Sequence, residues 1–166
     1  RDSLKTLGSG SGNTAVGYQS LRLMTTGGSN TVLGYQAMAV NTTGTYNVAI
    51  GKEAMIAADG AENNNIAIGA GAMGSVNLDT TEKNVAIGRN AGKGITTGQG
   101  VIAIGPNAAQ ENEDGTHNVA IGWQAMMGAS GKADRNVGIG TSTLLDITTG
   151  DSNVGVGYQA AQNVTS

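Results

Sequence analysis

Short runs of alternating aliphatic and polar or small residues recur along the chain, and each run ends in glycine. A representative run at 47–51 reads Asn-Val-Ala-Ile-Gly. Alternation with period two favours a short strand, with Val48 and Ile50 on one face and Asn47 and Ala49 on the other. Gly51 follows at once, and a missing Cβ at that place favours a corner. A second short segment is expected at 52–55, followed by a polar return at 56–63.

This unit occurs nine times, at intervals of 17 to 19 residues. So short and regular a period predicts stacked coils of one structural unit. The anchor glycines that end the nine runs are Gly17, Gly34, Gly51, Gly69, Gly88, Gly105, Gly122, Gly140 and Gly157.

The repeat predicts an all-β fold, a parallel β-solenoid or β-roll of nine coils of about 17 residues. An α-solenoid is disfavoured because 17 residues cannot hold a pair of ordinary helices, and a central glycine costs a helix about 1 kcal/mol. Val and Ile before that glycine favour strands instead. We expect an N-terminal flank at 1–12, the solenoid at 13–161 and a C-terminal flank at 162–166, with the whole being part of a longer chain.

Three columns appear when the copies are aligned. The residue before each anchor glycine is always aliphatic, and the third residue after it is always small. Met or Leu occupies the fourth position after the glycine in six copies. Because stacked coils place like residues above like, each coil offers two apolar rows. One row can fill the interior of the coil while the other contacts neighbouring chains. The sequence alone does not say which of the two rows is interior.

Asparagine begins eight of the nine copies. Stacked amides can hydrogen-bond along the axis of a coil and tolerate turn geometry. The Asn column is therefore expected to be structural.

Composition points to a thin core. The chain has 166 residues, 39% of them hydrophobic, but it has no Phe, one Trp and four Tyr. Such a core offers little area against chain entropy, so oligomerisation is expected. The absence of cysteine excludes thiol chemistry. A formal net charge of −3 without a basic patch disfavours nucleic acid, and no apolar run reaches the roughly 20 residues needed for membrane insertion.

The repeat resembles two known families. The unit Asn-x-Val/Ala-Ile-Gly-x-x-Ala is similar to the head repeats of trimeric autotransporter adhesins, whose units are shorter. The longer form at 13–21, followed by Thr-Thr-Gly at 25–27, 42–44, 96–98 and 148–150, more closely resembles repeats of bacteriophage tail-fibre proteins. The resemblance covers 13–161. It implies a homotrimer of left-handed β-rolls, intertwined or side by side, displayed on a virion or outside a cell.

Catalytic and cofactor motifs are weak. Residues 69–74 match G-x-G-x-x-G and residues 155–160 match G-x-G-x-x-A, but neither opens a long helix as a dinucleotide site requires. In 69–74 the glycines are the repeat anchor and two further positions. His117 is the single histidine and lies in a variable return, so neither a nucleophile–base pair nor a metal site is indicated. We expect no enzyme activity, no cofactor and no metal.

The position just after the anchor glycine, the corner column, is the best candidate for receptor binding. Four of the five aromatic residues occupy it: Tyr18, Tyr35, Trp123 and Tyr158. Glutamine follows each of them, so aromatic faces can stack on sugar rings while amides bind hydroxyls. The competing interpretation is that these rings merely pack on the next coil. Loops at 60–64 and 77–81, where the period lengthens, are second candidates.

The sequence thus predicts a structural and host-recognition segment of a trimeric phage tail fibre, located on the virion and acting as a rigid shaft or a receptor-binding head. Its partners would be other fibre or virion proteins and a cell-surface glycan or protein receptor. A bacterial adhesin head, extracellular or on the cell surface, is the alternative within the binding class. An ice-binding solenoid is the alternative from a different class, although Thr-Thr pairs occur in only some returns.

Overall fold

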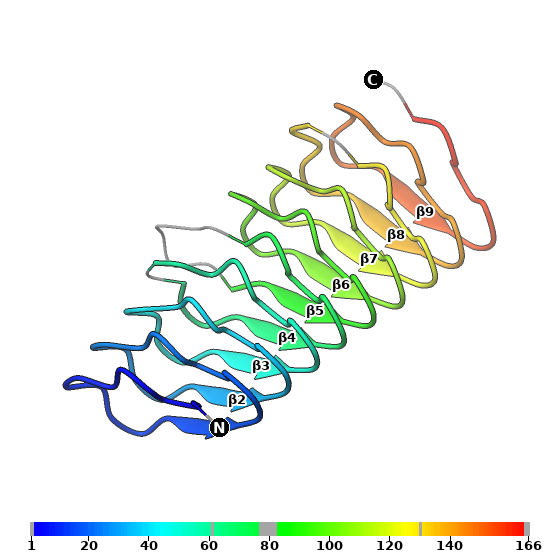
Figure 1. Ribbon diagram of the computed structural model, residues 1–166. Helices are drawn as coiled ribbons and strands as arrows, with labels where there is room; N and C mark the ends of the chain where they lie inside the picture. Colours follow the sequence, from blue (N-terminus) through cyan, green and yellow to red (C-terminus); the bar gives the residue numbers. More distant parts are fainter. Residues whose placement is uncertain (1, 61, 77–82, 130, 165–166) are drawn as a thin grey trace.

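The computed structural model describes residues 2–60, 62–76, 83–129 and 131–164. It is a rod of stacked coils with one parallel sheet along its length (Figure 1). The nine strands are β1 (Thr14–Val16), β2 (Thr31–Leu33), β3 (Val48–Ile50), β4 (Ile66–Ile68), β5 (Val85–Ile87), β6 (Ile102–Ile104), β7 (Val119–Ile121), β8 (Val137–Ile139) and β9 (Val154–Val156). Each coil is numbered by its strand.

The strands stack in chain order and in strict register. Every neighbouring pair is parallel, and equivalent repeat positions face one another, as where Ala49 pairs with Ala67 and Ile50 with Ile68. Longer intervals between anchor glycines do not shift this register, so the extra residues are accommodated in the returns. The predicted parallel β-solenoid is confirmed, and the described residues contain no helix.

The wall opposite the sheet is hydrogen-bonded along the stack but contains no strand. The second and fourth residues after each anchor glycine adopt left-handed backbone conformations, with φ of 54° at Gln36 and 45° at Met38. The N–H of Gln36 donates to the Tyr18 carbonyl of the preceding coil at 2.9 Å, and the N–H of Met38 to the Ala54 carbonyl of the following coil at 3.0 Å. This wall is therefore hydrogen-bonded to both the preceding and the following coil, although its residues do not adopt β-strand geometry.

The core lies between these two walls and is narrow. The middle residue of each strand points inward and is Ala, Gly or, once, Val. Opposite stand the buried Met and Leu side chains of the fourth column: Leu21, Met38, Met55, Met73, Met126 and Leu144. The Met/Leu row thus fills the coil. The Val/Ile row before each glycine points outward, because alternation places it on the face opposite the inward Ala.

A ladder of buried asparagines runs beside the sheet, as expected. The backbone N–H and Nδ2 of Asn47 both donate to Oδ1 of Asn30, at 2.9 and 3.1 Å. Nδ2 of Asn47 also donates to the Glu62 carbonyl at 2.6 Å. The ladder is interrupted at Val101, whose backbone N–H still donates to Asn84 Oδ1 at 2.8 Å, and it resumes at Asn118, whose Oδ1 accepts from the N–H of Asn136 at 2.9 Å. These amides pin the start of each coil to the coil before it.

The residues that flank the first and last strands continue the same hydrogen bonding. The N–H of Leu4 donates to the Ser20 carbonyl at 3.2 Å. This is the same kind of bond to the following coil that Met38, the fourth residue after its anchor glycine, makes with Ala54. At the other end, the N–H of Asp146 donates to the Gln162 carbonyl at 3.0 Å. The stacking pattern therefore extends on both sides of the nine strands.

Replacing an anchor glycine will destabilise the rod to a degree that depends on its neighbours. At Gly88, with φ of 135°, an added Cβ would lie 2.6 Å from the backbone C and O of Gly105. At Gly157, with φ of 122°, no heavy atom lies within 4 Å. We predict that Gly157→Ala costs about 1–2 kcal/mol from conformational strain, and that Gly88→Ala costs more than about 3 kcal/mol. Thermal unfolding followed by circular dichroism compares them, and equal losses would contradict the close-approach argument.

Two asparagines occupy a core column that is otherwise aliphatic, the seventh position after the anchor glycine. Oδ1 of Asn41 accepts from the N–H of Gly44 at 3.0 Å, and its Nδ2 donates to the buried carboxylate of Glu62 at 2.7 Å. The amide of Asn112 is equally buried, yet neither its oxygen nor its nitrogen has a hydrogen-bond partner among the described residues. Identical residues at one repeat position thus differ in hydrogen bonding.

Substituting these two asparagines will have opposite effects on stability. Asn41→Val strips a donor from a buried carboxylate, and we expect it to lower the free energy of unfolding by about 2–3 kcal/mol. Asn112→Val removes unpaired buried polar atoms and matches the Val found at this position in coil 4, so we expect an unchanged or increased stability. Thermal melts of both variants test this, and a similar loss in both would refute it.

Candidate functional site

The corner column is exposed in every coil except coil 8, where Thr141 is half-buried. Each anchor glycine turns the chain away from the sheet, so the next side chain projects from the edge between the two walls. The aromatic residues at this position remain accessible: Tyr18 47%, Tyr35 46%, Trp123 49% and Tyr158 74%. These four aromatic side chains are therefore accessible to solvent.

Only two of the four aromatic rings come together. Tyr18 and Tyr35 are stacked, with ring centroids 5.5 Å apart and an interplanar angle of 15°. Beside them, Nε2 of Gln36 donates to Oε1 of Gln19 at 2.8 Å. This pair packs coil on coil, as the competing interpretation held, and leaves its outer ring faces for a ligand. Trp123 and Tyr158 lie two coils apart and form no such stack.

A second exposed surface, the outer face, is formed by the first and third residues of each strand. Sixteen of its eighteen side chains are Val, Ile or Leu, and the other two are Thr14 and Thr31. At the ends of the rod these side chains are largely exposed, 56% at Val16 and 66% at Val156. A continuous aliphatic strip of this kind is unusual on a lone soluble chain and is a candidate interaction surface.

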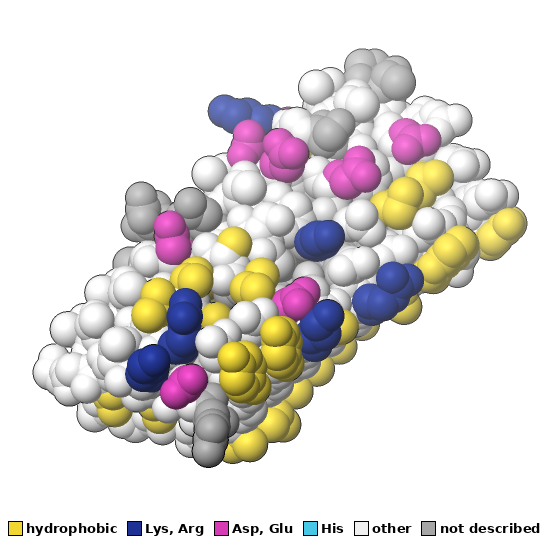
Figure 2. Space-filling model, in the orientation of Figure 1, with side chains coloured by type: hydrophobic (Ala, Val, Ile, Leu, Met, Phe, Trp, Pro, Cys, Tyr) yellow, Lys and Arg dark blue, Asp and Glu magenta, His cyan; other side chains and the backbone are white. Residues whose placement is uncertain are grey.

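The two surfaces share an edge. One anchor glycine separates the last outer-face residue of each coil from its corner-column residue, so the corner column borders the aliphatic strip from end to end. In Figure 2 the yellow side chains follow one edge of the rod, and dark blue Lys and Arg side chains lie next to them.

The corner column also borders a hollow that sequence reasoning missed. Gly71 and Gly74 form its floor in coil 4, and Lys52, Arg89 and Lys93 are its basic residues. The aligned repeats carried a signal for it. Eight of nine copies have a polar side chain, Gln, Glu, Asn or Ser, two residues after the anchor glycine, whereas coil 4 has Gly71.

The remaining candidates gather no catalytic or metal-binding chemistry. His117 is exposed in a return, where its backbone N–H donates to the Gln99 carbonyl at 2.8 Å. Within the described residues, no three His, Asp or Glu side chains are grouped so as to hold a metal ion. Of the two loops, 77–81 lies outside the described residues, as does residue 61 of the first. The described part of that loop includes the buried side chain of Glu62, which binds Asn41 rather than facing solvent.

Comparisons with known proteins do not assign a function to this chain, so a functional assignment depends on the surfaces described above. The chain matches no protein-family model, no curated protein and no solved structure. Across the described residues there is also no helix of the length and apolarity that a membrane span requires.

Proposed function

We propose that this chain is a structural and host-recognition segment of a trimeric bacteriophage tail fibre, in which three copies pack through their outer faces. The observation that carries the proposal is the aliphatic outer face, which runs the full length of the sheet and has no covering element in the described chain. The number of copies and the phage setting follow from the resemblance of the repeat to tail-fibre proteins.

The distribution of apolar side chains supports assembly on physical grounds. The interior holds small Ala residues, the Met/Leu column and the mostly aliphatic seventh column, whereas the Val, Ile and Leu residues at the first and third strand positions lie outside. Covering a fully exposed Val or Ile side chain contributes about 1.5–3 kcal/mol. Ten of the sixteen aliphatic residues are already half-buried and six are exposed, so association gains part of this value at each position. A rod of nine coils at roughly 4.8 Å spacing would then form a stiff trimeric segment about 40 Å long.

The corner column supports the recognition role. It borders the outer face, so assembly through that face would place the aromatic and basic side chains of each copy near the seams between chains. Each surface feature would be presented three times, which raises the avidity for a repetitive cell surface.

The two alternative functions, an adhesin head and an ice-binding solenoid, require different properties of these surfaces. A bacterial adhesin head would use the same trimeric rod on a cell rather than a virion. An ice-binding solenoid would need a flat exposed Thr array, but the flat face here is aliphatic, with Thr only at Thr14 and Thr31. The outer face therefore favours a protein partner over ice.

Charges introduced into the outer face should break the assembly. Ile87 and Ile104 are register partners at the centre of the sheet, and both side chains point outward. We expect Ile87→Glu with Ile104→Glu to reduce the native mass from trimer to monomer, because burying carboxylates in an apolar interface is very unfavourable. Ser11→Glu with Ser75→Glu adds the same charge at exposed positions off the face and serves as control. Light scattering after size-exclusion chromatography measures both, and an unchanged mass of the Ile variant would contradict assembly through this face.

The biological setting is tested by immunogold electron microscopy with antibodies raised against residues 1–166. The proposal expects label on the fibres of phage particles produced by the source. Label on the outer surface of bacterial cells in preparations free of particles would overturn the fibre assignment and favour the adhesin.

A further inference from the structure

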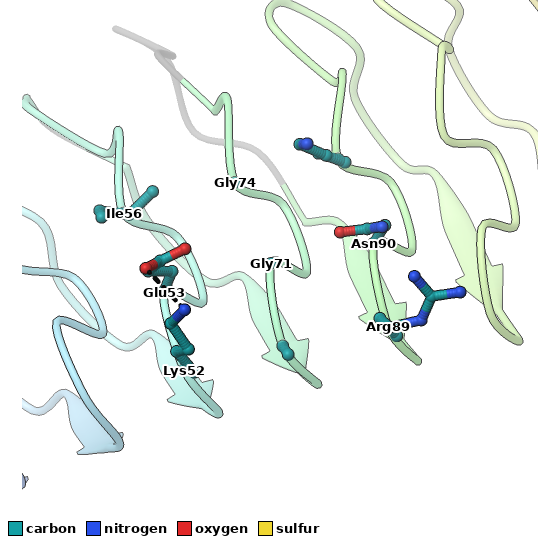
Figure 3. A pocket seen from close by; sticks show the side chains of 9 residues that line it. Lys52, Glu53, Ile56, Gly71, Gly74, Arg89 and Asn90 are labelled. Atoms are coloured by element: carbon teal, nitrogen blue, oxygen red, sulfur yellow. Dashed lines mark ion pairs between the residues drawn. The ribbon is translucent and has the colours of Figure 1, made fainter.

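The hollow beside the corner column is created by the loss of side chains in a single coil. Gly71 and Gly74 in coil 4 lie between coil 3, which contributes Lys52, Glu53 and Ile56, and coil 5, which contributes Arg89, Asn90 and Lys93. Figure 3 shows the longer side chains of coils 3 and 5 on either side of coil 4, where Gly71 and Gly74 have none. The cavity measures about 220 Å³, below the roughly 300–1,000 Å³ of pockets that enclose drug-sized ligands. It suits one small polar unit.

The hollow carries positive charge on an acidic protein. Its walls have three of the nine Lys and Arg residues of a chain with a formal net charge of −3. Lys52 pairs with Glu53 at 3.3 Å, and both remain partly exposed. Neither Arg89 nor Lys93 has a carboxylate partner among the described residues, and both side chains are exposed. These two cations are available to an anion.

The floor of the hollow is open because of its two glycines. In every other coil the residue equivalent to Gly71 carries a side chain, and all of those residues share its left-handed backbone, such as Glu53 with φ of 57° and Asn90 with φ of 56°. Gly71 itself has φ of 67°. Polar residues adopt a similar backbone conformation at this position in other coils, so the backbone does not require glycine there. A Cβ at this position would lie 2.7 Å from Oδ1 of Asn90, the tip of a side chain. The missing side chain therefore opens space between the flanking coils rather than relieving strain.

We propose that this hollow, the glycine groove, binds an anionic group carried by a saccharide: the carboxylate of an acidic sugar or a phosphate substituent of a surface polysaccharide. Arg89 and Lys93 supply charge-assisted hydrogen bonds to the anion, with the planar guanidinium suited to two oxygens at once. Asn90 and the Lys52–Glu53 pair offer donors and acceptors to ring hydroxyls. Arg89 leans away from Gly71 in Figure 3, so binding includes rotation of that exposed side chain.

The position of the groove fits a fibre. Lys52 and Arg89 belong to the corner column, so the groove opens along the border of the outer face and would appear once per chain in a trimer. This inference rests on the proposed function for its biological meaning, since an acidic glycan is a receptor only for a protein that meets cell surfaces. The binding chemistry itself is a property of one chain.

The test is an NMR titration of the isotopically labelled 166-residue protein with three probes: a galacturonic acid trisaccharide, inorganic phosphate and a neutral galactose trisaccharide. We expect the amide signals of Gly71 and Gly74 to shift with an anionic probe and not with the neutral one, and binding to weaken as salt is raised. The stronger anionic probe identifies the carboxylate or the phosphate as the ligand chemistry. No shift with either anion, or equal shifts with the neutral sugar, would overturn the proposal.

Three variants separate the groove from general charge effects. Gly71→Gln restores the side chain found in coils 1, 2, 7 and 9, so it should fold with an unchanged melting temperature while filling the groove and abolishing binding. Arg89→Gln with Lys93→Gln should weaken binding at least about tenfold. Lys132→Gln removes an exposed cation outside the groove and should leave binding unchanged. Wild-type affinity in a folded Gly71→Gln variant, or equal weakening in Lys132→Gln, would overturn the site.

These results are independent of the fibre assignment. A trimer that labels phage fibres but binds no anion defeats the groove alone. Anion binding by a chain that stays monomeric or labels bacterial cells supports the groove and defeats the fibre.

Discussion

The close approach of backbones at the anchor glycines is the constraint on which the rest of this structure depends. Along most of this column an added Cβ would fall 2.3–2.6 Å from the backbone of the glycine one coil away. Coils that stack this tightly must keep one register, and that register places like residues above like. The asparagine ladder, the Met/Leu core and the exposed corner column are all consequences of one repeated position that tolerates no side chain.

Tight stacking also limits what the coil can bury. With Ala or Gly in the middle of all but one strand and a turn-rich wall opposite, the interior is filled by the Met or Leu side chains of six coils and by the seventh column, which includes Met24, Ile95 and Ile147. The Val and Ile side chains at the first and third strand positions lie on the outer face, whereas Ile95 and Ile147 of the seventh column are buried inside. A protein whose larger strand residues face outward gains its full apolar burial only by association, which links the geometry of a single coil to assembly.

Much of the architecture could be predicted from the sequence because the repeat records it nine times. The glycine corner, the small residues after it and the asparagine ladder each follow from a column of like residues. The direction of the two apolar rows could not be predicted, since alternation separates two faces without saying which is interior. The wall opposite the sheet was also beyond reach, because Met and Leu in left-handed conformations, as at Met38 and Leu144, run against local preference.

The glycine groove shows a different limit. Gly71 and Gly74 look like unrelated residues within a false dinucleotide motif until the stack places them beside Lys52 and Arg89, about one coil away in each direction along the chain. Only the register between coils turns two missing side chains into a cavity. Candidate sites on solenoids are therefore best sought by comparing each coil with its neighbours at equivalent positions.

The native mass of the purified 166-residue protein, measured by light scattering after size-exclusion chromatography, tests the central claim that the outer face is an interface between chains. We expect a stable trimer of about three times 16.5 kDa. A well-folded monomer of 16.5 kDa at all concentrations would mean that the aliphatic strip is tolerated in water, and it would contradict the account.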